Sequence, residues 1–148
     1  RHQRGESLAE VDLTGADLTG ADLDGANLTN PKASLFGTNF TRANLDETNL
    51  SGVRLYNVNF TEANFGRAYL FYADLHKANL TRAKLSAAYL AGARIGGVYW
   101  SNETTWPPAL EDEIRAESAE AQTAVGAAAS RCDPGYQLRA GMPDGRAQ

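Results

Sequence analysis

The stretch A-D-L-T-G-A-D-L-D-G-A-N-L-T at residues 16–29 repeats one five-residue pattern of alanine, aspartate or asparagine, leucine and two turn-forming positions. Outward from this stretch, a large apolar residue recurs every five positions from Leu8 to Ile95, with one two-residue insertion between Leu28 and Leu35. The resulting 18 units use 14 of the 16 leucines, and in 12 units the residue two positions earlier is alanine. This regularity indicates a repeat fold.

A period of five matches neither the 3.6 residues of a helical turn nor the two-residue alternation of a strand, so each unit has to contain a turn. Alanine and leucine two positions apart point to the same side of a short extended segment. Glycines at the fifth position, such as Gly15 and Gly20, tolerate the positive φ that a tight corner needs. Four corners close a square coil, so the sequence predicts an all-β solenoid of about four and a half coils, with leucine and alanine inside.

Units such as A-D-L-T-G at 16–20 and A-N-L-T-R at 78–82 resemble the pentapeptide-repeat family, whose pattern is A-[DN]-L-x-x. The resemblance covers residues 6–100 and implies a right-handed quadrilateral β-helix. It also implies a function, because some members of the family bind type II topoisomerases such as DNA gyrase in place of DNA and protect against topoisomerase poisons.

Three regions follow from the composition. Residues 1–100 are predicted as the repeat, 101–131 as a cap and helix, and 132–148 as an irregular or disordered tail. The segment from Ala109 to Arg131 is rich in helix-forming residues, with acids near its start.

No apolar run is long enough to span a membrane, and the single cysteine, Cys132, excludes an internal disulfide. A reducing compartment fits this cysteine usage, so we expect a cytoplasmic location.

Outward positions four units apart lie above one another in such a coil, which lets surface columns be read from the sequence. One column holds Thr19, Thr41, Thr61 and Thr81, beside Arg42, Glu62 and Arg82; another holds Arg54, Asp74 and Arg94. Stacked hydroxyls and alternating charges are favourable neighbours across strands. The simplest interpretation of these columns is structural.

Two adjoining faces instead carry aromatic or imidazole side chains at outward positions. They are Phe36, Tyr56, Tyr69, Phe71, Tyr72, His76 and Tyr89. A core does not need them, so one interpretation is a docking surface for a partner protein. The alternatives are stacking between coils, or cover from the chain's own tail.

An open last coil leaves an apolar floor and an unpaired edge that have to be covered. Trp100 and Trp106 are the predicted lids, since they follow directly after Ile95, and Leu110 and Ile114 lie on the predicted helix. The family resemblance implies a second role for these four residues, in which two rods join end to end.

Catalysis needs convergent groups in a dry pocket, and a leucine-filled interior offers none. We therefore expect no enzyme activity and no catalytic, cofactor-binding or metal-binding residues; an Asp74-x-His76 pair is at most half of a metal site. The leading hypothesis is a rigid interaction scaffold that binds a partner protein or a second copy. The alternative is a DNA mimic that binds gyrase, with no direct contact to nucleic acid. Mimicry requires a sustained negative surface, whereas residues 32–100 are net +4 between two segments of net −4.

Overall fold

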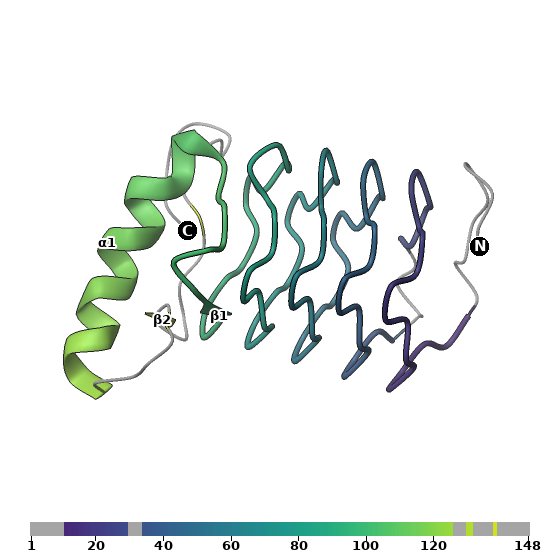
Figure 1. The fold of residues 1–148 in the computed structure, drawn as a ribbon, viewed down its shortest axis with the longest axis horizontal. Helices are drawn as coiled ribbons and strands as arrows, with labels where there is room; N and C mark the ends of the chain where they lie inside the picture. The colour runs from purple at the N-terminus through teal and green to yellow at the C-terminus, as the bar shows by residue number, and fades with distance from the viewer. Residues whose placement is uncertain (1–10, 30–33, 126–129, 132–137, 139–148) are drawn as a thin grey trace.

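A computed structural model describes residues 11–29, 34–125, 130–131 and 138 of the chain. They form a rod of stacked coils with a helix lying across one end (Figure 1). The regular elements are β1 (Tyr99–Trp100), α1 (Pro108–Val125) and β2 (Ser130–Arg131), and β1 pairs antiparallel with β2. The insertion at residues 30–32 and, apart from Leu138, the predicted tail at 132–148 lie outside the described residues.

Parallel backbone bridges join each coil to the next. Asn39 pairs with Asn59, Asn59 with Asn79, and Asn79 with Tyr99, so four five-residue units complete one coil. The bridges fall into four columns, which define the four faces of the rod. Each unit contributes one bridged residue and then turns, which is why the coils contain isolated bridges rather than long strands.

The two inward columns that the period predicts are buried. From Leu35 to Ile95 every central leucine, phenylalanine or isoleucine is at most 2% exposed, and the small residues two positions before them, from Thr38 to Ala93, are buried as well. Phe40, Phe60 and Phe65 pack their rings together in the interior, with centroids 5.3 and 4.9 Å apart. Leu13 and Leu18, in the first described coil, are only partly buried.

Threonine replaces alanine at three inward positions, Thr38, Thr48 and Thr104, and links one coil to the next. The hydroxyl of Thr38 donates to the carbonyl oxygen of Leu13 at 2.7 Å, and that of Thr48 donates to the carbonyl oxygen of Leu23 at 2.8 Å. A buried hydroxyl without a partner would be destabilising, so these bonds explain how threonine is tolerated in the core.

Most of the described corners are β-turns with a positive φ at the last turn residue, as expected for glycine. Gly15, Gly20 and Gly52 have φ between +67° and +70°. Seven other residues at such corners also have positive φ although they carry side chains: Arg42, Glu47, Asn57, Glu62, Tyr72, Lys77 and Arg82. Stacking against neighbouring coils imposes this conformation where the sequence alone would not predict it, since a non-glycine residue rarely adopts it.

The inward pattern continues past Ile95, where the sequence analysis ended the repeat. Trp100 and Trp106 occupy the next two central positions, and Thr105 still bridges to Lys84 in the coil below. One extra residue is accommodated in the turn at Ser101, which gives this bridge a spacing of 21 residues.

Helix α1 lies where the sequence analysis predicts a helix after the proline pair, but it ends at Val125 rather than at Arg131. Ser130 and Arg131 form β2 instead, and they pair with the end of the coil at β1. Gly126 directly follows α1 in the sequence, and glycine is the usual helix-stop residue. No helix in the described ranges combines the length and the apolar character needed to cross a bilayer.

Candidate partner-binding surface

Two adjacent faces of the rod carry the predicted aromatic residues. We call them the tyrosine face, whose bridge column contains Tyr69 and Tyr89, and the arginine face, whose bridge column contains Arg54, Asp74 and Arg94. The seven predicted residues together are named the aromatic surface: Phe36, Tyr56, Tyr69, Phe71, Tyr72, His76 and Tyr89.

On the arginine face, three rings from successive coils form one stack. Phe36 lies 5.6 Å from Tyr56, and Tyr56 lies 5.6 Å from His76, with interplanar angles of 11° and 14°. The ammonium group of Lys77 lies 5.7 Å from the centre of the Tyr56 ring, within the range of a cation–π contact. The stack therefore holds its rings in fixed positions.

On the tyrosine face, three further rings cluster. Tyr69 and Tyr89 stack at 5.2 Å, and Phe71 lies 5.6 Å from Tyr89 and 6.4 Å from Tyr69. Tyr72 stands at the corner between the two faces, and its ring covers Gly92 in the next coil: a Cβ at Gly92 would lie 2.5 Å from ring atoms Cδ1 and Cε1 of Tyr72. The absence of a side chain at residue 92 thus makes room for this ring.

Stacking leaves much of the aromatic surface in contact with solvent. Five of its members keep 36–50% of their surface exposed: Phe36, Tyr69, Phe71, Tyr72 and Tyr89. Tyr56 and His76 are half-buried. The structure therefore brings all seven residues together on two neighbouring faces, and their mutual stacking does not bury them.

The Asp74-x-His76 pair has a local backbone role. The Asp74 carboxylate accepts the backbone N–H of His76 at 3.1 Å, while the His76 ring stacks on Tyr56. Asp74 therefore orders the turn at the start of the next corner.

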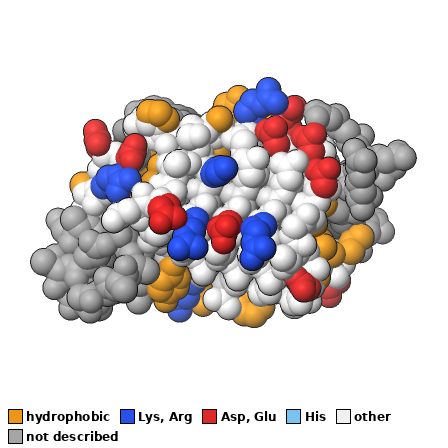
Figure 2. Space-filling model, viewed as in Figure 1, with side chains coloured by type: hydrophobic (Ala, Val, Ile, Leu, Met, Phe, Trp, Pro, Cys, Tyr) orange, Lys and Arg blue, Asp and Glu red, His pale blue; other side chains and the backbone are white. Residues whose placement is uncertain are grey.

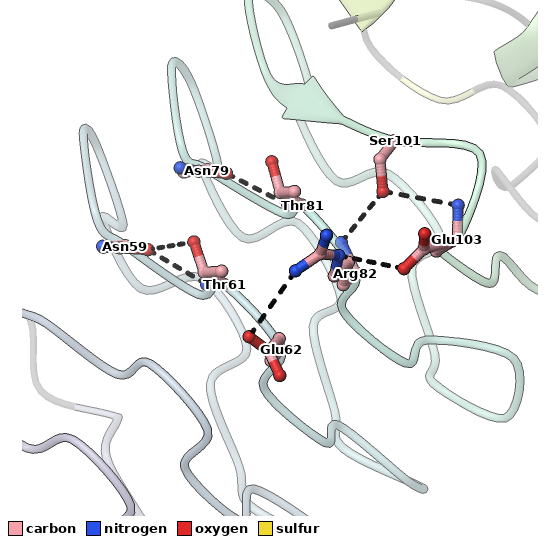
Figure 3. Close-up of polar contacts among 8 residues, drawn as sticks. All are labelled: Asn59, Thr61, Glu62, Asn79, Thr81, Arg82, Ser101 and Glu103. Atoms are coloured by element: carbon pink, nitrogen blue, oxygen red, sulfur yellow. Dashed lines mark hydrogen bonds and ion pairs between the residues drawn. The ribbon is translucent and has the colours of Figure 1, made fainter.

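The face opposite the tyrosine face, which we call the threonine face, is polar and internally bonded (Figure 3). The hydroxyls of Thr41 and Thr61 donate to Asn39 and Asn59 within the same unit, both at 2.6 Å, rather than to each other along the predicted ladder. Arg82 pairs with Glu103 at 2.9 Å and approaches Glu62 at 4.0 Å. Figure 2 shows a face on which acidic and basic side chains alternate along the rod, with hydrophobic side chains mainly at its edges.

The structure also gathers three carboxylates that the sequence analysis missed. Single oxygen atoms of Asp24, Asp46 and Glu47 lie within 4.8 Å of one another, which is close enough to hold a cation. Arg67 already offsets this charge, because its guanidinium lies 2.8 Å from Glu47 and 3.7 Å from Asp46. The backbone N–H of Arg67 donates to Asp46 and, with a smaller contribution from the guanidinium charge, holds the pKa of that carboxyl below its usual value. The repeat spacing could have predicted this cluster, because Asp24 and Asp46 occupy equivalent positions in consecutive coils.

Tyr99 is a further exposed aromatic residue that sequence reasoning did not select, because the repeat was taken to end four residues earlier. It extends the bridge column of the threonine face beyond Asn79. Tyr99 therefore lies outside the aromatic surface.

The four predicted cap residues are all buried within one chain. Trp100 and Trp106 meet edge to face at 6.0 Å, and Leu110 and Ile114 of α1 belong to the same hydrophobic core. The Arg115 guanidinium lies 5.1 Å from the Trp100 ring centre. These four side chains pack together at the end of the coil, and their role as an end cap or in joining two rods stays a prediction.

The repeats, the four-sided coil and the filled interior define a solenoid built from five-residue units. The chain belongs to the pentapeptide-repeat family: the family pattern for pentapeptide repeats matches it in eight copies, over residues 4–30, 33–70, 48–86 and 63–99. Proteins of this family form right-handed quadrilateral β-helices and are generally structural or interaction proteins.

Solved structures of the same family resemble this chain. HetL, a pentapeptide repeat protein involved in heterocyst differentiation regulation from the cyanobacterium Nostoc sp. strain PCC 7120, is 38% identical with a TM-score of 0.61. That match covers 66% of this chain but only 40% of HetL. Rfr23 from the cyanobacterium Cyanothece 51142 is 33% identical with a TM-score of 0.50, over 62% of this chain and 64% of Rfr23.

QnrB1, a plasmid-mediated fluoroquinolone resistance protein, matches at 20% identity and a TM-score of 0.25, over 64% of this chain and 67% of QnrB1. A likeness of this size carries no argument about function. The comparison with curated proteins found no match.

Proposed function

We propose that this chain is a non-enzymatic, rigid interaction scaffold that binds a partner protein through its aromatic surface. One observation supports this proposal above the others: rings held in fixed stacks on two adjacent faces keep up to half of their surface exposed. Exposed, ordered aromatic clusters are typical of protein interfaces, because such rings lose little conformational entropy on binding.

The rest of the fold supports a structural role. The interior is filled by leucine, phenylalanine and alanine, and backbone bonds of 2.7–3.1 Å, such as Phe40 to Asn59, run from coil to coil. Such a ladder resists bending and presents a preformed surface, which lowers the entropic penalty of binding. The cytoplasmic location expected from the cysteine usage is part of the same proposal.

The experiment compares the variant Tyr69→Ser/Phe71→Ser/Tyr89→Ser with the wild type and with Tyr99→Ser as a matched control. Tyr99 is exposed to a similar extent but lies on the threonine face. We expect the triple variant to keep its far-ultraviolet circular dichroism and to lose the proteins that copurify with the wild type, while the control retains them. A folded triple variant that still retains every partner would refute the proposal.

Mimicry of DNA toward gyrase has less support in the charge distribution. A DNA mimic needs negative charge along its length. Exposed acids are concentrated in the first described coil, at Asp12, Asp17 and Asp22, whereas Arg54 and Arg94 lie exposed farther along the rod. Supercoiling by gyrase, with and without a quinolone, tests this alternative directly. We expect no effect of the chain at micromolar concentration, and protection from the quinolone would favour mimicry over the scaffold.

A further inference from the structure

Two arginines lie between the two halves of the aromatic surface. Arg54, Asp74 and Arg94 bridge to one another in consecutive coils of the arginine face, and both arginines are exposed. In chain order around the coil, this column follows Tyr72 and precedes the Phe36–Tyr56–His76 stack. The basic column is therefore flanked by rings on both sides.

Within the described ranges, neither of these arginines has an acidic group at salt-bridge distance. Arg67, Arg82 and Arg115, by contrast, each lie 2.8–2.9 Å from a glutamate. The sequence analysis expected alternating pairs along the column, but the Asp74 carboxylate faces the backbone N–H of His76. The column therefore presents two guanidinium groups to solvent, and guanidinium groups favour carboxylates as partners.

The spacing of the two arginines constrains what they could bind together. Neighbouring coils lie about 4.8 Å apart, so Arg54 and Arg94, two coils apart, are separated by roughly 9.6 Å along the rod. A polyproline II segment has three residues per turn and rises about 3.1 Å per residue, so side chains three positions apart face the same way at about 9.3 Å. A third carboxylate of the ligand, placed between Arg54 and Arg94, would lie beside Asp74 and be repelled by its negative charge.

We propose that the aromatic surface binds an extended acidic segment of a partner protein, in which two carboxylates three residues apart pair with Arg54 and Arg94. The other two rows of side chains in such a segment point sideways, toward Tyr72 and Phe71 on one side and Tyr56 on the other. Apolar side chains in these rows pack on the rings. This inference rests on the proposed function, and it adds the chemical class of the partner.

The charge distribution agrees with this choice of ligand. The chain as a whole has a net charge of −4, but residues 32–100, which contain the aromatic surface, are net +4. A basic patch on an acidic protein attracts acidic partners and accelerates their association, and this effect weakens as salt is added.

The test begins with a displayed library of random twelve-residue peptides, selected on the immobilised full chain. We expect the selected sequences to be net negative, with two acids three positions apart and apolar residues between them. One such peptide, labelled with fluorescein, is then titrated with chain variants by fluorescence anisotropy. Arg54→Gln/Arg94→Gln should weaken binding about tenfold, which corresponds to about 1.4 kcal/mol shared between two exposed ion pairs. Added salt should weaken wild-type binding as well.

Arg42→Gln is the matched control, because Arg42 is an exposed arginine of the threonine face that likewise has no acid at salt-bridge distance within the described ranges. It should change the affinity less than twofold. Peptides that need Tyr69, Phe71 and Tyr89 but bind the double arginine variant normally would overturn this inference and leave the proposed function standing. Selected peptides that depend on neither set would overturn both. Displacement of the peptide by an oligothymidine at lower concentration would overturn the acidic segment in favour of a nucleic acid.

Discussion

Substitution of Gly92 by alanine tests how the corner between the tyrosine and arginine faces positions Tyr72. Gly92 has φ of +73°, and a Cβ there would lie 2.5 Å from two atoms of the Tyr72 ring. Gly52 is the equivalent corner two coils away, with φ of +70°, and a Cβ there would meet no atom within 4 Å. The two alanine variants therefore share the backbone strain and differ in the ring contact.

The backbone part should be the same in both variants, about 1–2 kcal/mol for a non-glycine residue in the left-handed region. The ring part applies only to Gly92→Ala. A tyrosine buries roughly 150–250 Å² when enclosed, and Tyr72 keeps 50% of its surface exposed. If the ring swings outward and loses half of its remaining contact, the loss at ~25 cal/mol/Å² is about 1–1.5 kcal/mol. We expect Gly92→Ala to be less stable than Gly52→Ala by this amount.

Urea unfolding followed by circular dichroism measures both variants, and the Tyr72→Ala background completes a double-mutant cycle. Without the ring, the two glycine substitutions should destabilise the chain equally. Equal losses in the background that retains Tyr72 would refute the reasoning, because they would show that the ring does not rest on Gly92. Because Gly92→Ala displaces Tyr72, it should also weaken binding of the acidic peptide more than Gly52→Ala does.

Two further predictions concern the cap and the acidic cluster. Ile114→Ala should lower the free energy of unfolding, measured in urea, by about 2–5 kcal/mol, because removal of a fully buried side chain leaves a cavity between α1 and the last coil. The control is Asp112→Ala: Asp112 is exposed on the same helix, and its substitution should change the free energy of unfolding by less than about 0.5 kcal/mol. Equal effects of the two variants would contradict the buried position of Ile114. A nuclear magnetic resonance titration should find the pKa of Asp46 below its usual value, and Arg67→Gln should retain most of that shift, because the backbone N–H is its largest cause. Since the folded-state pKa lies below the unfolded one, this contact stabilises the fold at neutral pH and its contribution is lost as the pH falls through the folded-state pKa; a return of Asp46 to its usual pKa in Arg67→Gln would show that the side chain dominates instead.

The family and the inward columns were accessible from the sequence because they depend on short-range geometry. Alanine and leucine two positions apart share one side of an extended segment, and the turn after them closes within three residues, as in the bond from Ala16 to Leu13. The aromatic surface was predictable for the same reason, since a constant four-unit coil places Tyr69 and Tyr89 in one column. The prediction lost accuracy at the end of the repeat. One extra residue near Ser101 takes Trp106 out of the five-residue period, and Trp100, which is still in register, was interpreted as a lid and not as a central residue.

The sequence by itself determined the period, the buried face and the columns into which outward side chains fall, because each of these repeats identically from unit to unit. Only the tertiary structure decided what those side chains do within their columns. It directed the Asp74 carboxylate to the His76 backbone instead of an arginine, set Arg67 against two acids of the coil below, and placed the Tyr72 ring over Gly92. These outcomes depend on a choice between several possible partners that lie a few ångströms apart in three dimensions. The five-residue spacing of the sequence does not show which of these partners a side chain will bond.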